Sequence, residues 1–136
     1  LRVDDAVAAT QAAIQEGIVP GGGVELVLSG NSIGVDSLGL TNKDQEMGAD
    51  IVLKSLKDPL FQMLKNAGVS GELVFAEIIK RGDNTGFNIN SGEYENMVES
   101  GIVDPAKVTK TALRNAVSIA SMVLTTEVIV ALKKNN

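Results

Sequence analysis

The chain has 136 residues, 44% of them hydrophobic, which is enough for one domain with a core. Its 12 Lys and Arg against 17 Asp and Glu give a net charge of -5, which argues against a nucleic-acid binder with a basic surface. Because the sequence contains no Cys and no His, it excludes disulfides, thiol nucleophiles, Ser-His-Asp triads and zinc fingers.

Two features of the chain concern its cellular context. Charged residues interrupt each apolar segment before the roughly 20 residues of a membrane span, so we expect no membrane partner. The sequence starts at Leu1 with neither a signal peptide nor an initiating Met. We therefore expect an excised or processed segment of a longer protein.

The segment 4–16 is rich in Ala, has two acids in its first turn and stops at Gly17, which predicts a helix. At 100° per residue, Asp5 projects from a face of small side chains. The expected apolar seam lies on the opposite side and is formed by Val3, Val7 and Ile14.

Three glycines, Gly21 to Gly23, follow this helix. They allow positive φ and a close approach of the backbone to another group, either in a plain helix-to-helix turn or beside a ligand. Carboxylates at Asp5 and Asp104 are the candidate partners for a ligand. After the glycines, 24–28 is a short apolar piece and 29–42 is predicted to be a loop.

Helical patterns follow over 43–57, from Asp58 to about 67, and from 70 or 71 onward. The run 81–86 contains an Arg-Gly-Asp triplet, which we interpret as a turn rather than an adhesion motif. Alternation over 87–90 predicts a short strand.

Asp104 and Pro105 are typical of a helix N-cap followed by proline at the first helical position. The helix that follows is apolar over two adjacent stripes as far as Leu124, so we expect it to be the central core helix. The β-branched run 127–132 predicts a strand that needs a partner, within this chain or outside it.

Five stretches of this sequence resemble the group I chaperonins, the 60-kDa class of protein-folding ring. They occur in the family's order and read RVDDA (2–6), EGIVPGGG (16–23), EYENM (93–97), GIVDPAKV (101–108) and TTE (125–127). The resemblance implies a mainly α fold, half of a chaperonin equatorial domain, with a short β-hairpin region and a C-terminal strand. Residues 1–16 would be the returning helix of the intermediate domain, and 17–136 the C-terminal half of the equatorial ATPase domain.

The same resemblance implies roles for single residues. Asp5 matches the catalytic aspartate that activates water for attack on the γ-phosphate of ATP. Gly22 matches the glycine lying against the nucleotide, and Asp104 matches the carboxylate that binds the ribose hydroxyls. The positions expected around the adenine are Asn88, Ile89 and Ile102.

The resemblance further implies ATP and Mg²⁺ as cofactors, heptameric homo-oligomeric rings, a 10-kDa co-chaperonin and unfolded client proteins. The compartment would be bacterial cytoplasm, mitochondrial matrix or plastid stroma. However, the family's Asp-Gly-Thr-Thr-Thr phosphate loop, with its Mg²⁺ ligand, is not in this sequence, so we expect negligible ATP hydrolysis by this chain alone.

The sequence also departs from the family pattern. The run 30–34 interrupts a helix that is usually continuous, Ile89 and Asn90 replace smaller residues, and C-terminal Gly-Gly-Met repeats are absent. Two other readings stay open: a stand-alone helical interaction module without nucleotide activity, and a non-ATPase relative that keeps the equatorial fold.

Overall fold

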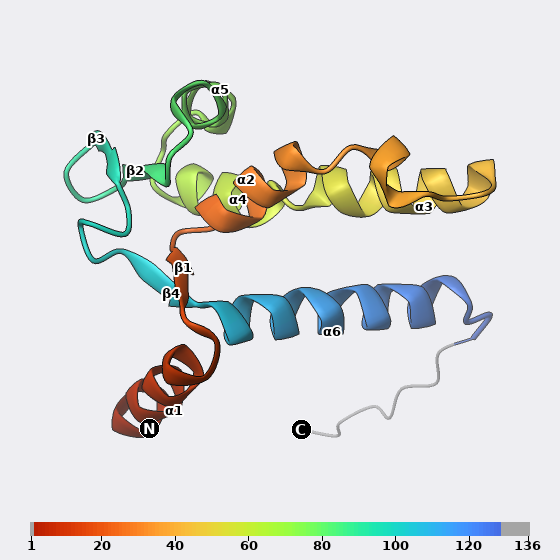
Figure 1. Ribbon diagram of the computed structural model, residues 1–136, viewed down its shortest axis with the longest axis horizontal. Coiled ribbons are helices and arrows are strands. Elements are labelled where there is room, and N and C mark those ends of the chain that lie inside the picture. Colours follow the sequence, from red (N-terminus) through yellow and green to blue (C-terminus); the bar gives the residue numbers. More distant parts are fainter. Residues whose placement is uncertain (1, 129–136) are drawn as a thin grey trace, which may run out of the picture.

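The computed structural model describes residues 2–128, and its elements are mainly helical. Short strands connect or flank the helices (Figure 1). In chain order the elements are α1 (Arg2–Glu16), β1 (Ile18–Pro20), α2 (Val24–Ser32), the 3-10 helix η1 (Val35–Leu38), α3 (Lys43–Ser55), α4 (Asp58–Asn66), α5 (Gly71–Arg81), β2 (Thr85–Asn88), β3 (Glu93–Asn96), β4 (Val103–Pro105) and α6 (Ala106–Leu124).

The helices form two levels joined by a pair of strands. Figure 1 shows α2, α3 and α4 along one side, α6 running beneath them, and α1 below β1 and β4. Strand β1 pairs antiparallel with β4, with Val19 opposite Asp104. Strand β2 pairs antiparallel with β3, with Phe87 opposite Tyr94. The first pair therefore joins the glycine turn to a segment more than 80 residues later in the chain.

The core lies in the upper level, among α2, α4, α5 and the segment after β3. Leu64 and Ile78 are completely buried, and burial of each such side chain stabilises the fold by about 1.5–3 kcal/mol. Phe61 and Phe75 add an edge-to-face ring contact at 5.9 Å on the flank of this core. The buried apolar cluster comprises Val24, Val27, Leu60, Leu64, Val74, Ile78 and Met97.

The expected central position of the last helix is wrong for this structure. No residue of α6 is buried, and Ile119 is 59% exposed. An apolar periodicity indicates that one face of a helix packs against another element, but it does not identify that element. Here α1 and β4 contact α6, while its apolar residues toward Leu124 stay exposed.

The apolar seam predicted for the first helix is also exposed. Ile14 is 81% and Val3 75% exposed, whereas the half-buried residues of α1 include Ala9 and Ala12. Small side chains let the backbones of α1 and α6 approach closely, so the face that carries Asp5 is the one used for packing.

Several expected boundaries need correction. The predicted loop 29–42 is shorter, because α2 continues to Ser32 and η1 follows. The strand expected at 87–90 occupies Thr85–Asn88 instead. Of the terminal strand expected at 127–132, residues 129–132 lie outside the described residues, and 127–128 are not in a strand.

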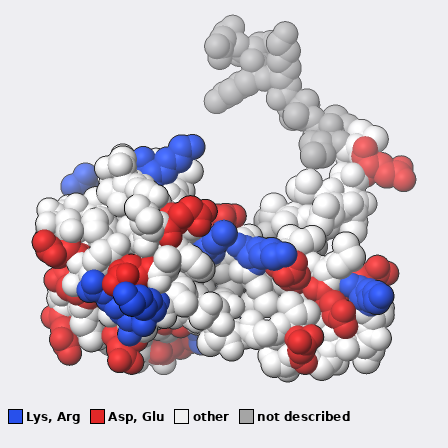
Figure 2. Space-filling model, turned by 90° about the horizontal axis from the view of Figure 1, so that it is seen from above, with Lys and Arg blue, Asp and Glu red and all other residues white. Residues whose placement is uncertain are grey.

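Charged side chains of both signs are mixed on the surface. Figure 2 shows Lys and Arg beside Asp and Glu on the face that it draws, without a continuous basic stripe there. Within residues 2–128, every helix is too short or too polar to cross a lipid bilayer.

Candidate functional site

The glycine turn and the segment before α6 meet at the β1–β4 pair. Gly21 donates its backbone N–H to the carbonyl oxygen of Ile102 at 2.9 Å. A Cβ on Gly21 would lie 3.0 Å from that oxygen, so the two backbones are too close for a side chain. Gly22 has φ +66°, a conformation that glycine adopts without strain. The turn is therefore built for backbone approach, as the sequence predicts.

Asp104 is a strand residue and not the N-cap of the following helix, so that expectation is wrong. It lies on β4 opposite Val19, and α6 begins at Ala106 with Pro105 in the cap position. The first amide of α6, at Ala106, donates to the carbonyl oxygen of Gly17 at 3.1 Å. Because Gly17, the residue before β1, satisfies this amide, Asp104 is not needed as a cap. Asp104 is exposed, so its carboxylate is available to a ligand.

A groove of about 470 Å³ opens beside Asp104 between the two levels of helices. Among residues 2–128, Glu25 and Asp104 are the charged residues that line it, and no Lys or Arg does. An apolar groove with two acidic residues suits apolar side chains or the uncharged part of a ligand, and it disfavours phosphate groups. Its lining residues are Pro20, Gly23, Glu25, Leu26, Ser55, Leu56, Pro59, Met63, Asp104, Val108, Thr109, Ala112, Leu113 and Ala116.

Asn88 and Ile89 lie at the end of the β2–β3 hairpin. The Nδ2 atom of Asn88 donates to a carboxylate oxygen of Glu95, and its Oδ1 accepts from the backbone N–H of Asn90 at 2.9 Å. Ile89 is 44% exposed. An amide with a fixed orientation and an accessible apolar side chain together form a surface that could contact a flat ring.

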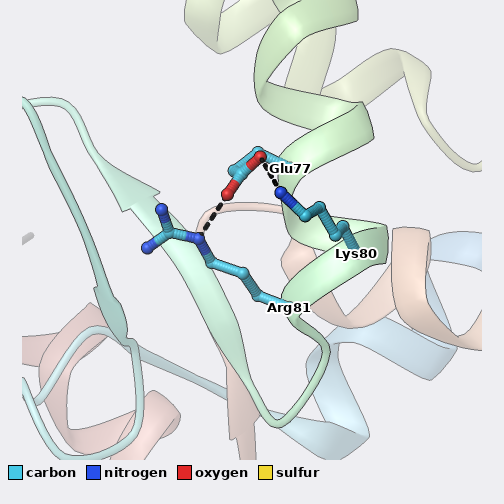
Figure 3. Close-up of polar contacts among 3 residues, drawn as sticks. All are labelled: Glu77, Lys80 and Arg81. Carbon is cyan, nitrogen blue, oxygen red and sulfur yellow. Dashed lines mark hydrogen bonds and ion pairs between the residues drawn. The ribbon is translucent and has the colours of Figure 1, made fainter.

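The end of α5 holds the hairpin in place. Figure 3 shows Glu77 between Lys80 and Arg81. The Glu77 carboxylate accepts from Arg81 Nε at 2.7 Å, and this bond holds the pKa of Glu77 below its ordinary value. The Arg81 guanidinium lies 4.6 Å from the centre of the Tyr94 ring on β3. Arg81 is thus engaged within the fold, and the turn predicted over 81–86 is shorter, because Arg81 ends α5 and β2 begins at Thr85.

The structure does not bring Asp5 to the glycine turn. Asp5 lies in the first turn of α1, 11 residues before Glu16, and is exposed. A straight helix separates these two residues by roughly 16 Å along its axis. The other end of α1 is attached to α6, because Lys110 pairs with Glu16 and Lys107 donates to Gln15.

The predicted residues therefore fall into three places: Gly22, Ile102 and Asp104 around the β1–β4 pair, Asn88 and Ile89 on the hairpin, and Asp5 at the far end of α1. The first two places are connected, because Ile102 donates its N–H to the carbonyl oxygen of Met97, which follows β3. Residues 2–128 contain no group of three or more Asp or Glu that could hold a metal ion.

Sequence reasoning missed Glu95 as the partner of Asn88. The antiparallel pairing places Asn88 opposite Glu93, so Glu95 lies diagonally across the hairpin from Asn88. Glu95 can be identified as the partner of Asn88 only once the pairing of β2 with β3 is known.

Comparison with known proteins places this geometry in a family. Residues 1–134 match the TCP-1/cpn60 chaperonin family. A group II chaperonin from Methanococcoides burtonii, solved as an open-state monomer, is similar with a TM-score of 0.71 and 21% identity over 80% of this chain. A group III chaperonin in the open state is similar with a TM-score of 0.74 and 28% identity over 88% of this chain. The matches cover 28% and 25% of those chains, so this chain spans about a quarter of their length.

Proposed function

The chain belongs to the TCP-1/cpn60 chaperonin family, and we propose that it supplies the nucleoside side of an ATP site in an ATP-dependent protein-folding ring. The observation that carries the proposal is the β1–β4 pair, where Gly21 N–H to Ile102 O joins the glycine turn to the strand of Asp104. ATP would lie against the turn, with its ribose hydroxyls donating to Asp104.

The described residues fit the nucleoside and not the metal. Gly22, at φ +66°, gives the turn a backbone without a side chain, and Asp104 offers an exposed carboxylate as acceptor. Mg²⁺ needs oxygen ligands that residues 2–128 do not gather in one place, so the metal would depend on groups outside this part of the chain. When bound, Mg²⁺ would neutralise charge on the phosphates.

Asp5 is the proposed catalytic aspartate, and its position at the far end of α1 means that this helix must move for Asp5 to act. To act on water near the γ-phosphate, α1 must bring the Asp5 carboxylate toward the nucleotide. Gly17 has φ +81° and connects α1 to β1, and no residue of α1 is buried. Both observations support residues 1–16 as an intermediate-domain helix that moves relative to an equatorial part, 17–136.

The finer assignment to group I rests on the sequence stretches, since the two solved structures are described as group II and group III. Membership of group I would imply heptameric rings, a 10-kDa co-chaperonin and unfolded client proteins. It would also imply bacterial cytoplasm, mitochondrial matrix or plastid stroma as the compartment. Cross-linking of the protein in its native source would count subunits per ring, and a number other than seven would contradict this assignment.

The central experiment is calorimetric titration of the 136-residue chain with ATP. We expect binding that is weakened at least about tenfold by Asp104→Asn, since a neutral amide is a poorer acceptor for two hydroxyls. Asp36→Asn in the exposed η1 helix is the matched control and should bind as the unsubstituted chain does. Equal affinities for the two variants would contradict the ribose role of Asp104.

Hydrolysis gives a second test. We expect negligible ATP turnover by this chain alone, because its sequence has no Asp-Gly-Thr-Thr-Thr loop to hold the phosphates. Phosphate release that disappears in Asp5→Asn would contradict this expectation and show that the chain assembles a complete site.

The apolar groove beside α6 favours a second candidate function, a helical interaction module without nucleotide activity. The intact mass of the polypeptide in its native source separates the two. A much longer chain supports the chaperonin ATP site, whereas a polypeptide of 136 residues that does not bind ATP supports the interaction module.

A further inference from the structure

The carboxamide of Asn88 is held at both ends by other groups of the chain. Its nitrogen donates to Glu95, and its oxygen accepts from the N–H of Asn90 at 2.9 Å. An asparagine amide has two N–H donors and two acceptor lone pairs. One N–H donor and one oxygen lone pair of Asn88 therefore remain free within residues 2–128. The two hydrogen bonds fix the orientation of the amide, and so they fix the side on which each free group lies.

Glu95 connects this amide to the loop that leads to Ile102. Its second carboxylate oxygen accepts from Ser100 Oγ at 2.7 Å. The hydrogen bond from Ser100 and, next, that from Asn88 hold the pKa of Glu95 below its ordinary value. Glu95 is thus an ionised acceptor near neutral pH, and its two bonds are of the stronger, charge-assisted kind.

Ser100 is itself well placed to support Glu95. Its backbone N–H donates to the carbonyl oxygen of Asn96 at 3.0 Å, and the Asn96 side chain accepts from the backbone of Val98 at 3.0 Å and Glu99 at 3.2 Å. Local hydrogen bonds therefore hold the loop 96–100 in one conformation. Glu95, which binds both Ser100 of this loop and Asn88, links that conformation to the hairpin.

We propose that Glu95 is a positioning residue for nucleobase selection, because it sets which end of the Asn88 carboxamide faces the base. The inference rests on the proposed nucleotide site. Adenine presents an amino donor beside a ring-nitrogen acceptor, whereas guanine presents a carbonyl acceptor at the place of that amino group. An amide of fixed orientation distinguishes these patterns, while an amide free to turn by 180° offers oxygen or nitrogen to either base.

The test compares affinities of the 136-residue chain for ATP and GTP, measured by calorimetry. We expect the unsubstituted chain to prefer ATP and Glu95→Ala to reduce the ratio of the two affinities by about tenfold, the worth of one oriented hydrogen bond. Glu95→Gln should keep most of the preference, because its amide oxygen can still accept from Asn88 while Ser100 accepts from its amide nitrogen.

Glu93→Ala is the matched control. Glu93 lies directly opposite Asn88 on the same hairpin and carries the same charge, but its carboxylate has no hydrogen bond or ion pair within residues 2–128. This variant should keep the ATP preference. A similar loss in Glu93→Ala and Glu95→Ala would overturn the inference, because it would trace the effect to charge rather than to orientation.

The side-chain amide signal of Asn88 in a nitrogen-15 NMR spectrum provides a readout without nucleotide. We expect its two proton shifts to be well separated in the unsubstituted chain and in Glu93→Ala, and to converge in Glu95→Ala. Shifts that do not respond to Glu95→Ala would overturn the inference.

The outcomes distinguish the inference from the proposed function. An unsubstituted chain that binds neither nucleotide overturns both. A chain that prefers ATP, and keeps this preference in Glu95→Ala, overturns the positioning role alone and leaves the nucleotide site intact.

Discussion

Gly21 and Ile102 are joined backbone to backbone, with the amide of one 2.9 Å from the carbonyl oxygen of the other. A Cβ at Gly21 would meet three backbone atoms of Ile102 and Val103 at 3.0–3.1 Å. Backbone atoms at the end of a strand pair cannot move aside as a flexible side chain can. We therefore expect even one methyl group added at Gly21 to destabilise the turn.

Gly21→Ala should lower the free energy of unfolding by about 1–3 kcal/mol, the usual cost of overpacking. Urea denaturation followed by circular dichroism measures the change. Gly48→Ala is the control, because Gly48 lies within α3 with nothing within 4 Å of its added Cβ. It should stabilise the chain by about 0.5–1 kcal/mol through helix propensity. Equal effects of the two variants would show that the β1–β4 approach is not tight in solution.

Asp104→Ser separates a ligand role from a structural one. The Asp104 side chain is exposed and does not cap α6, so the substitution should change the free energy of unfolding by less than about 0.5 kcal/mol. ATP affinity should fall, because a serine hydroxyl is a weaker acceptor than a carboxylate. A large loss of stability in thermal melting would mean that Asp104 supports the fold.

The ion pair between Glu16 and Lys110 should make the attachment of α1 depend on pH. The hydrogen bond from Lys110 holds the pKa of Glu16 below its ordinary value in the folded chain. A lowered pKa means that the stabilisation is complete above the ordinary glutamate value of about 4.3 and is lost as pH falls through the folded-state pKa.

A pair of spin labels on α1 and α6 would follow this attachment as a distance at decreasing pH. We expect the distance distribution to broaden on acidification and at high salt, because the pair is solvent-exposed. Glu16→Gln removes the titrating group and should abolish this pH response. A response that persists in Glu16→Gln would assign it to other carboxylates.

The exposed apolar face of α6 predicts self-association of the chain in solution. Ile119 is 59% and Val123 54% exposed, and no charged side chain occurs between Asn115 and Thr126. Sedimentation velocity should show larger species as concentration rises, and Ile119→Lys should reduce them.

Ile51→Lys is the control for this prediction, because Ile51 is 66% exposed but lies on α3 and not on α6. The control should sediment as the unsubstituted chain does. A monodisperse monomer with one sharp melting transition at all concentrations would contradict the prediction.

The sequence alone predicted the local elements well where the signal lies within one segment. Gly17 as the end of the first helix, and Asp58 with Pro59 as the start of α4, are confirmed because capping and propensity act over a few neighbouring residues. The mainly α fold of a chaperonin equatorial-domain segment is likewise confirmed by the family match and the solved structures.

Only the tertiary structure decided how the candidate site is arranged. Strands β1 and β4 have three residues each, too few for a periodic pattern, and they exist because they pair with each other across the chain. That pairing made Asp104 a strand residue instead of a cap and placed it beside the glycine turn. The exposure of α6 and the distance of Asp5 from the glycine turn depend on which surfaces pack together. Such contacts between distant segments cannot be predicted from the periodicity of one segment.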